Sequence, residues 1–270
     1  MTFSIVARSD DGESWGVAVA SKFLAVGSAV PAAVAGVGAI ATQADANVSY
    51  KFLALGHLDD GATAPVALDR LLEEDDKRDH RQVGIVDLEG TAASHTGSEC
   101  YDWAGGTTGP GYAIQGNILT GPEVVDAMEK AWLASREQPL ARRLTAALRA
   151  GDEAGGDSRG RQSAALLVVK DGAGYGGLDD VAADLRVDDH ADPVAELIRL
   201  LDLSDLYLTA STEEEKVAVD DALRSELDDR ARSAGRADFR AWVGAENYEM
   251  RVAEDLTWVD RRVLEILRAG

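Results

Sequence analysis

Apolar and polar positions alternate from the beginning of the chain. Residues 3–8, FSIVAR, carry apolar side chains at every second position, which is the period of a β-strand. Residues 14–23 are almost continuously apolar, as is typical of a strand that is covered on both faces. The turn sequence Asp10-Asp11-Gly12 separates these runs, and residues 28–42 predict one or two more strands. The chain is therefore expected to open with a β-meander.

Helical and strand patterns follow in groups along the next 160 or so residues. The expected elements are helices over 47–74 with a break at Gly61, strands at 82–88 and 91–96, a glycine-rich loop at 105–111, a strand at 112–119, a helix that begins near Pro122, a helix at 139–150, strands at 163–170 and 185–187, and a helix at 194–203. This order predicts an α+β fold, in which helices can cover both outer faces of two stacked antiparallel sheets.

The composition changes near residue 211. Helical spacing and acidic residues dominate from there, with expected helices over 212–231, 238–243 and 259–267. We therefore predict two domains, residues 1–207 and residues 211–270, of which the second is a small helical appendage.

The excess of acidic residues makes some classes of binding partner unfavourable. The formal net charge is −21, from 48 acidic and 27 basic residues, which disfavours binding to nucleic acid and to anionic membranes. Only six of the basic residues are Lys, so the chain fits a halophilic host, or alternatively a mesophile with a GC-rich genome. The acidic run 73–76 is expected to be a solvated loop.

Compartment signals are few. The single cysteine, Cys100, excludes an internal disulfide, and no signal peptide or membrane-spanning run is evident, so we expect a cytoplasmic protein. Asp188, Asp189 and His190 are the best candidates for metal ligands, but a turn before a helix explains them better. We therefore predict no metal and no cofactor.

Thr2 is the candidate of greatest chemical interest. Methionine followed by a small residue is a good substrate for methionine removal, and loss of Met1 would give Thr2 a free α-amine beside its hydroxyl. That amine has an unperturbed pKa of about 7.7–8.0 and can accept the hydroxyl proton. Thr with an N-terminal amine is a known activated nucleophile. Many chains begin with Met-Thr for reasons of processing alone, so position does not decide between these interpretations.

Polar residues near the ends of apolar strands form the remaining candidates. Amides there can orient a substrate or stabilise an oxyanion, or they can fasten loops. The amide candidates are Gln43, Asn47, Gln115 and Asn117. The other binding candidates are Thr96 and Gly97, whose N–H could serve an oxyanion, and the cluster Asp157, Arg159 and Gln162 before a buried strand. An Asp–Arg ion pair that holds a loop is the alternative for that cluster.

Several motifs resemble a known family. They are TFSIVAR, GVAVASKFLAVG, AGVGAIATQA, HRQVGIVD, TGPGYAIQGNIL, GGDSRGRQSAALLVV, YGGLDD and LRVDDH. Over residues 2–205 the chain resembles the uncharacterised family catalogued as domain of unknown function 1028, which is assigned to the Ntn-hydrolase (N-terminal nucleophile) superfamily. Residues 211–270, with WVGAENYEMR and WVDRRVLEILR, are similar to a peptidoglycan-binding-like tail.

The resemblance implies a four-layer αββα sandwich and raises the interest of Thr2, because the first mature residue of that superfamily attacks an amide carbonyl. It also implies a basic residue beside the nucleophile, for which Lys22 is the candidate, with Ser21 at the same place; a surface lysine at a strand end is the alternative. The reaction is superfamily analogy.

We therefore expect an Ntn-type amidohydrolase that acts on a small amide or peptide-like substrate, with Thr2 as nucleophile and Lys22 as its catalytic neighbour. The alternative is a non-catalytic binding or assembly protein on the same fold, a homo-oligomer such as a dimer, in which the helical tail contacts the partner. A metal-dependent hydrolase is the third and weakest hypothesis.

Overall fold

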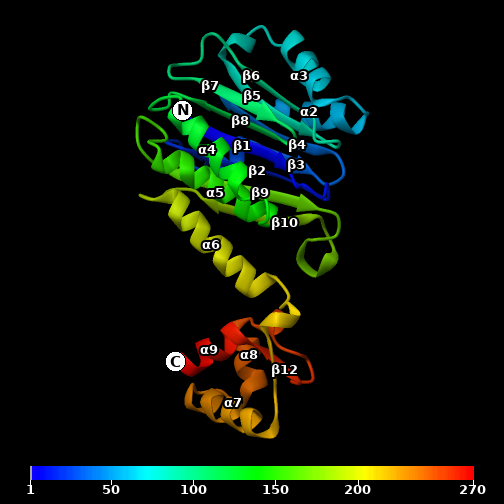
Figure 1. The fold of residues 1–270 in the computed structure, drawn as a ribbon, viewed down its shortest axis with the longest axis vertical. Coiled ribbons are helices and arrows are strands. Elements are labelled where there is room, and N and C mark those ends of the chain that lie inside the picture. The colour runs from blue at the N-terminus through cyan, green and yellow to red at the C-terminus, as the bar shows by residue number, and fades with distance from the viewer. Residues whose placement is uncertain (1) are drawn as a thin grey trace. The chain divides into compact units, whose positions relative to one another are not determined.

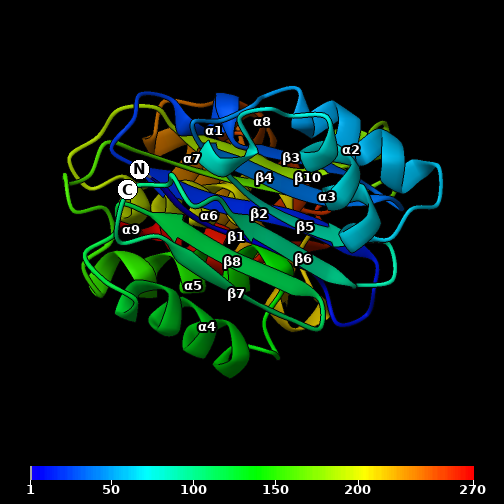
Figure 2. The same ribbon diagram turned by 90° about the horizontal axis from the view of Figure 1, so that it is seen from above.

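The structure is a computed structural model that describes residues 2–270. The chain divides into two compact units, Met1–Leu200 and Leu201–Gly270, and the division falls within one long helix. Figures 1 and 2 show the two units, each of which is described by itself below.

Two antiparallel sheets form the larger unit. The six-stranded sheet has the order β10-β9-β2-β1-β8-β7, with β1 (Thr2–Arg8), β2 (Ser14–Ser21), β7 (Gly105–Gly109), β8 (Tyr112–Asn117), β9 (Ser163–Lys170) and β10 (Val181–Val187). The four-stranded sheet has the order β3-β4-β5-β6, with β3 (Pro31–Val34), β4 (Gly38–Ala44), β5 (Arg81–Asp87) and β6 (Ala92–Thr96). β1 and β2 lie inside the first sheet, and β4 and β5 lie inside the second, so their backbones are paired on both edges.

The following helices lie in the larger unit, the last of them only in part. They are α1 (Val26–Ala29), α2 (Tyr50–Asp59), α3 (Ala64–Glu73), α4 (Glu123–Ala134), α5 (Leu140–Glu153) and α6 (Pro193–Leu208). α4 and α5 lie against the six-stranded sheet, whereas α2 and α3 lie against the four-stranded sheet (Figures 1 and 2). In α5 the buried positions Leu140, Leu144, Ala147 and Leu148 follow the three-and-four spacing of one helix face.

Apolar side chains fill the space between the layers. One buried cluster contains Val6, Val17 and Val19 from the six-stranded sheet together with Ala39 and Val86 from the four-stranded sheet. A second cluster joins the four-stranded sheet to α2 and α3. The continuous apolar character of β1 and β2 follows from this arrangement, because both faces of these strands are covered.

The smaller unit contains three helices and a short two-stranded sheet. These elements are β11 (Lys216–Ala218), α7 (Asp221–Ser233), α8 (Phe239–Glu246), β12 (Trp258–Asp260) and α9 (Arg261–Ala269). Its core is one cluster built on Leu227, Phe239, Trp242 and Val263. Each helix begins with an aspartate whose carboxylate accepts a backbone N–H of the first turn, which satisfies one otherwise unpaired donor.

The expected mixture of helices and antiparallel sheets is confirmed, with nine α-helices among residues 2–270. The strand expected at residues 163–170 has the observed bounds, and the break at Gly61 separates α2 from α3. A short helix, α1, lies within the region in which only strands were expected.

The expected glycine-rich loop at 105–111 is wrong for its first five residues, which form β7. The glycines allow β7 to lie close to its neighbour rather than to turn. A Cβ atom added to Gly106 would lie 2.5 Å from the carbonyl oxygen of Ile114, so a larger residue would push the strands apart.

The helix expected from residue 212 is also wrong at its start. Thr212 begins only a 3₁₀ turn, Glu213–Glu215, and β11 follows it. The helix proper starts after Asp220, whose carboxylate accepts the N–H of Leu223 at 2.8 Å. Both positions carry an N-cap signal, and the apolar side chains that the core requires lie after the second one.

The acidic run 73–76 is not entirely solvated. The Asp75 carboxylate accepts hydrogen bonds from Arg81 Nε at 2.8 Å and from the Tyr50 hydroxyl at 2.7 Å. The bond from Arg81 lowers the pKa of Asp75, and burial together with this carboxylate raises the pKa of Tyr50. Spacing along the chain gave no indication of this ion pair, because its partners lie on α2 and β5.

Candidate functional site

Polar side chains converge where strands of both sheets end. Thr2 begins β1 and lies opposite Asn117, the last residue of β8. Ser21, at the end of β2, lies opposite Ser163 at the start of β9. Antiparallel pairing places the start of one strand beside the end of its neighbours, so residues far apart in sequence meet at one edge.

Thr2 is buried, with 6% of its surface exposed. Its Oγ1 lies 3.1 Å from Ser21 Oγ, so the two hydroxyls share a hydrogen bond. Its carbonyl oxygen accepts hydrogen bonds from Gln43 Nε2 at 3.3 Å and from Asn117 Nδ2 at 3.5 Å. Both the backbone and the side chain of Thr2 are therefore held by neighbours from other strands.

A group of five buried neutral side chains surrounds this position, and we call it the amide cluster: Ser4, Gln43, Gln82, Gln115 and Asn117. Each of them is at most 1% exposed. They come from β1, β4, β5 and β8, so the cluster spans both sheets. Buried polar groups are stable only when they are hydrogen-bonded, which makes the contacts within the cluster decisive.

Gln82 lies at the centre of the amide cluster. Its Oε1 accepts hydrogen bonds from Gln43 Nε2 at 2.8 Å and from Asn117 Nδ2 at 2.9 Å. Its Nε2 donates to Gly116 O at 2.7 Å and to Thr96 Oγ1 at 2.9 Å. Both amides that hold the Thr2 carbonyl are thus hydrogen-bonded to one glutamine of the four-stranded sheet.

Ser4 continues the network on the other side. Its hydroxyl donates to Gln43 Oε1 at 2.7 Å and accepts from Gln115 Nε2 at 2.7 Å. Gln115 Oε1 is buried and has no hydrogen-bond partner among the described residues. It lies directly over Gly84, where an added Cβ would be 2.2 Å from this oxygen, so only glycine leaves room for the Gln115 side chain.

The chemistry that this arrangement can perform follows from its neutrality. Hydroxyls and amides can orient a substrate and donate hydrogen bonds to a developing negative charge, but no side chain of the amide cluster can act as a base near neutral pH. A base for the Thr2 hydroxyl must come from another group. The α-amine that Thr2 would carry after loss of Met1, which lies outside the described residues, is such a group.

Lys22 does not join the amide cluster. Its side chain is exposed, and its Nζ donates to the carbonyl oxygen of Arg161 at 3.3 Å. β2 ends at Ser21, so Lys22 lies beyond the sheet, where its backbone N–H donates to the Asp157 carboxylate at 2.6 Å. The structure thus supports the surface interpretation of Lys22 in its position, and brings Ser21 rather than Lys22 to Thr2.

Asp157 and Arg159 fasten a loop. The Asp157 carboxylate accepts from the backbone N–H groups of Lys22 at 2.6 Å and of Arg159 at 2.9 Å, and Arg159 Nη2 lies 3.4 Å from it. Gln162 contacts Asp189 instead, through Nε2 at 3.1 Å. The expected polar cluster therefore divides into a loop anchor beside β2 and a separate contact at the surface.

Asn47 and Gly97 also have structural partners. Asn47 Oδ1 accepts from Ser49 N and Oγ before α2, and its Nδ2 lies 3.4 Å from Asp75. The Gly97 N–H donates to the carbonyl oxygen of Arg81 at 2.9 Å, so in this structure it does not point toward an oxyanion. Thr96, by contrast, accepts from Gln82 and thereby joins the candidate site.

Two members of the amide cluster, Ser4 and Gln82, were not among the sequence candidates. The signal for both is an uncharged polar residue within a largely apolar strand, Ser4 in FSIVA and Gln82 in RQVGIVD. A strand covered on both faces has no outward position for such a residue, so its presence predicts a buried hydrogen-bond partner.

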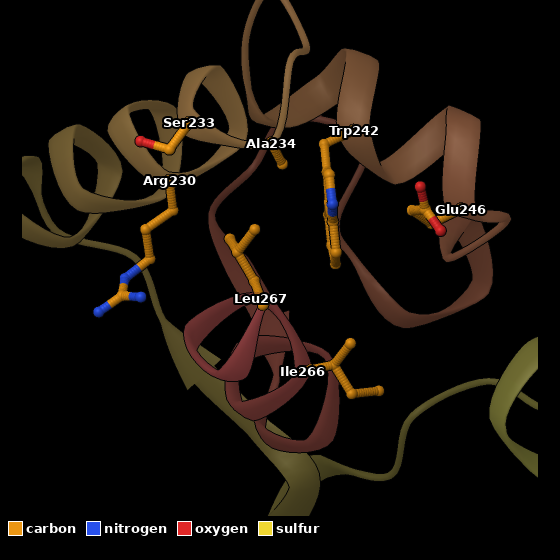
Figure 3. Close-up of a pocket in the computed structure, with 8 residues that line it drawn as sticks. Arg230, Ser233, Ala234, Trp242, Glu246, Ile266 and Leu267 are labelled. Atoms are coloured by element: carbon orange, nitrogen blue, oxygen red, sulfur yellow. The ribbon is translucent and has the colours of Figure 1, made fainter.

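Two cavities are relevant to binding. One has a volume of about 320 Å³ and lies between the edge strands β6 and β7, lined by Ser94, Thr96, Gly105, Gly106, Thr107 and Thr108. The other, in the smaller unit, has a volume of about 380 Å³ and lies between α7, α8 and α9. Figure 3 shows Trp242 facing Leu267 across this second cavity.

Other candidate chemistry has a structural explanation. Burial raises the pKa of the half-buried Cys100 thiol, which lies near the carbonyl oxygen of Arg81. His190 Nδ1 accepts the N–H of Asp192, as in a turn. Among residues 2–270, no three His, Cys, Asp or Glu side chains are grouped so that they could hold a metal ion. Within the same residues, no helix has the length and apolarity that crossing a bilayer requires.

Comparison with known proteins places the chain among relatives of unknown function. A model of a family of unknown function (DUF1028) matches residues 2–197, and a peptidoglycan-binding-like domain matches residues 209–267. The chain is similar to a crystal structure of a protein from Silicibacter pomeroyi that carries the same family model. The two are 33% identical with a TM-score of 0.69, over 76% of this chain and 89% of the other. No curated protein matches the chain.

Proposed function

Because the chain belongs to the DUF1028 family, whose function is unknown, we propose a function from the site itself: an Ntn-type amide hydrolase with Thr2 as its nucleophile. The observation that carries the proposal is the position of Thr2. A buried hydroxyl at the first residue of a central strand, 3.1 Å from a second hydroxyl and held through its carbonyl by two amides, is a positioned and not a mobile group.

We include the fold in this proposal, as a four-layer αββα sandwich of the Ntn-hydrolase kind. Its support is the packing of α4 and α5 on the six-stranded sheet and of α2 and α3 on the four-stranded sheet, with an apolar cluster that contains residues of both sheets. Thr2 would then lie at one end of the space between the two sheets.

The reaction would proceed in two steps after removal of Met1. The Thr2 α-amine accepts the Oγ1 proton while Oγ1 attacks the substrate carbonyl carbon, whose π electrons move to its oxygen. Collapse of this adduct breaks the C–N bond, and the leaving amine takes the proton from the α-ammonium. Water then attacks the ester with the same amine as base, which releases the acid and restores the Thr2 hydroxyl.

In this mechanism Ser21 and the amide cluster would have different tasks. Ser21 hydrogen-bonds the nucleophile directly and would orient its Oγ1. Gln43 and Asn117 would hold the strand end that carries the α-amine, since they bind the Thr2 carbonyl. An uncharged surrounding would keep the pKa of the amine close to neutral, where its neutral form is available as a base.

The experiment is covalent labelling with a β-lactone, which acylates an activated threonine hydroxyl. Two forms of the chain are compared, one that begins at Thr2 and one that retains Met1, by intact mass and by fragmentation. We expect an adduct on Thr2 in the first form, and a rate lower by a factor of about 10²–10⁴ in the second, because the general base is missing.

Matched variants complete this test. Thr2→Ala should give no adduct, whereas Ser21→Ala should keep the adduct and form it more slowly. Equal labelling of the two chain forms, or labelling of Thr2→Ala at the same rate, would show that Thr2 is not the nucleophile.

The second candidate function is that of a non-catalytic binding or assembly protein. Exposed apolar side chains favour it: Phe52 on α2 is 77% exposed, and Phe23 and Leu24 before α1 are 54% and 60% exposed. The Lys51 ammonium donates to the carbonyl oxygen of Ser28, which joins these two segments. The domain that matches the smaller unit also has a description that names binding, of peptidoglycan.

Sedimentation of the wild type and of Phe52→Asp tests the second function. A homo-oligomer that uses this surface should dissociate in the variant, and the matched change Phe239→Asp is unsuitable because that residue is buried. Deletion of residues 211–270 tests instead whether the smaller unit makes the contact. A wild type that sediments as a monomer argues against assembly.

A further inference from the structure

The cavity between β6 and β7 has an unusual lining. Four of its six lining residues, Ser94, Thr96, Thr107 and Thr108, carry hydroxyl groups, and the other two are glycines. No lining residue is charged. Thr107 Oγ1 already donates to the Glu129 carboxylate at 3.2 Å, so Ser94, Thr96 and Thr108 supply the hydroxyls for a ligand. The cavity therefore offers donors and acceptors of hydrogen bonds without a counter-ion.

The lining restricts the class of ligand. A volume of about 320 Å³ lies at the lower end of the range of roughly 300–1,000 Å³ that is typical of small-molecule sites. A charged ligand would lose part of its hydration here without gaining an ion pair, whereas a neutral hydroxyl or amide group can exchange its bonds to water for bonds to the lining. The chemistry fits a small neutral group that bears hydroxyls or an amide.

The wall of the cavity is in direct contact with the amide cluster. Gln82 Nε2 donates to Thr96 Oγ1 at 2.9 Å and lies 3.3 Å from the carbonyl oxygen of Gly105, and both of these residues line the cavity. Through Oε1 the same side chain fixes Gln43 and Asn117, which hold the Thr2 carbonyl. We call Gln43 and Asn117 the Thr2 clamp. Gln82 thus contacts both the cavity wall and the Thr2 clamp.

An unsatisfied oxygen lies beside the same wall. Gln115 Oε1 is buried, has no partner among residues 2–270, and lies over Gly84. In the sheets Gly84 is opposite Ser94 and Gln115 is opposite Gly106, and these two opposite residues both line the cavity. A buried acceptor without a partner destabilises the folded state, so a donor that entered from this side would form a favourable hydrogen bond with it.

We propose that the cavity between β6 and β7 is a binding site for a small neutral hydroxyl- or amide-bearing group, and that Gln82 transmits its occupancy to the Thr2 clamp. The binding itself does not depend on catalysis. The functional meaning of the transmission through Gln82 rests on the proposed function, in which Gln43 and Asn117 position the Thr2 nucleophile.

The test is a titration of the ¹⁵N-labelled full chain with N-acetylglucosamine, a neutral probe that carries both hydroxyls and an amide. We expect saturable shifts of the Thr96, Gly105 and Gly106 backbone amides. The side-chain NH₂ groups of Gln82 and Asn117 should shift with the same Kd. Activity is not measured, so a failure of the hydrolase proposal leaves this result interpretable.

Three variants separate binding from transmission. Thr96→Val should weaken binding at least about tenfold and should abolish the Asn117 response at saturation. Thr108→Val, which alters the lining at a residue that is not a hydrogen-bond partner of Gln82 within the described chain, should weaken binding but retain that response. Thr91→Val, an exposed threonine before β6, should change neither.

Three other results would each contradict one part of the proposal: the site, the ligand class or the transmission through Gln82. The absence of saturable shifts at Thr96, Gly105 and Gly106 with both N-acetylglucosamine and acetamide would remove the site. Tighter binding of the cationic analogue glucosamine would contradict a neutral ligand class. Binding without a response of the Asn117 side chain would refute transmission through Gln82.

Discussion

Each unit of the molecule contains a buried network of polar side chains, which we call a polar centre, and these two centres differ in kind. In the larger unit it is the amide cluster, whose members are neutral. In the smaller unit it is an ion pair, in which Arg251 Nη1 lies 2.9 Å from Asp260 Oδ2. The Arg251 and Asp260 side chains are 3% and 0% exposed, so this pair is as deeply buried as the amides.

The ion pair is a structural hub. Arg251 also bonds the carbonyl oxygens of Asp205 and Leu206, and Asp260 begins α9 by accepting the N–H of Arg262 at 2.8 Å. Burial acts to raise the pKa of Asp260, but hydrogen bonds from Ser211, Arg262 and Arg251 outweigh it and leave the pKa lowered. The pair therefore stays ionised and connects three segments of its unit.

The difference teaches what each centre can be used for. A buried charge needs its partner at all times, so an ion pair specifies one arrangement and is unsuited to a site that must accept a ligand. Neutral amides can exchange one hydrogen-bond partner for another at a lower cost, and they do not alter the pKa of a nearby amine by charge. This is why we place the function at the amide cluster.

The largest effect is expected where the ion pair is broken. Arg251→Met leaves the Asp260 carboxylate buried without its cation, and the free energy of unfolding of the smaller unit should fall by about 3–5 kcal/mol. Native-state hydrogen exchange of the α9 amides measures this loss. The double variant Arg251→Met/Asp260→Asn should recover much of it, because no buried charge remains. A single variant as stable as the wild type would contradict the role of the pair.

A smaller loss of stability is expected when the amide cluster is disrupted. Gln82→Met removes the acceptor of both Gln43 and Asn117, and we expect the free energy of unfolding of the larger unit to fall by about 3 kcal/mol. Urea denaturation followed by exchange of the β5 amides measures it. The exposed Gln138 provides the control, since Gln138→Met should change stability little. A loss for Gln82→Met that exceeds that for Arg251→Met would reverse the comparison between the centres.

Loss of the Asp75 carboxylate should have a still smaller effect on stability. Its ion pair with Arg81 is only partly buried, and Tyr50 supports it. Asp75→Asn should lower the free energy of unfolding by about 2 kcal/mol. The pKa of Asp75 is lowered from its ordinary 3.8, so its contribution is complete above that value and is lost as the pH falls toward the lowered pKa. Acid titration of stability should therefore show a slope below about pH 4 that the variant lacks.

The sequence predicted much of the fold because most of its signals are local. The apolar run of β9, the Gly61 break and the helical spacing of α5 each depend on neighbours a few residues away. The wrong expectations had non-local causes. The glycines of β7 serve close packing on β8, and Asp75 finds its partners on α2 and β5.

The same distinction explains the candidate site. Thr2 was identified from its place after Met1, Ser21 from the family resemblance and Asn117 from its place near a strand end. The structure brings them together. Lys22 follows the end of β2, but its side chain is exposed and donates to the carbonyl oxygen of Arg161. Gln82 was missed because its partners are 14 to 39 residues away along the chain and mostly on other strands.

The smallest loss of stability should come from changing Glu215, the exposed neighbour of the Arg251–Asp260 ion pair. Glu215 Oε2 lies 3.2 Å from Arg251 Nη1, but its side chain is 37% exposed, so solvent screens the interaction. Glu215→Gln should lower the free energy of unfolding of the smaller unit by less than about 1 kcal/mol. Hydrogen bonds from Thr212 lower the pKa of Glu215 from 4.5, so this small contribution is present above that pH and declines below it. A loss close to that of Arg251→Met would mean that Glu215, and not Asp260, is the principal partner of the arginine, and that the buried centre of this unit extends to its surface.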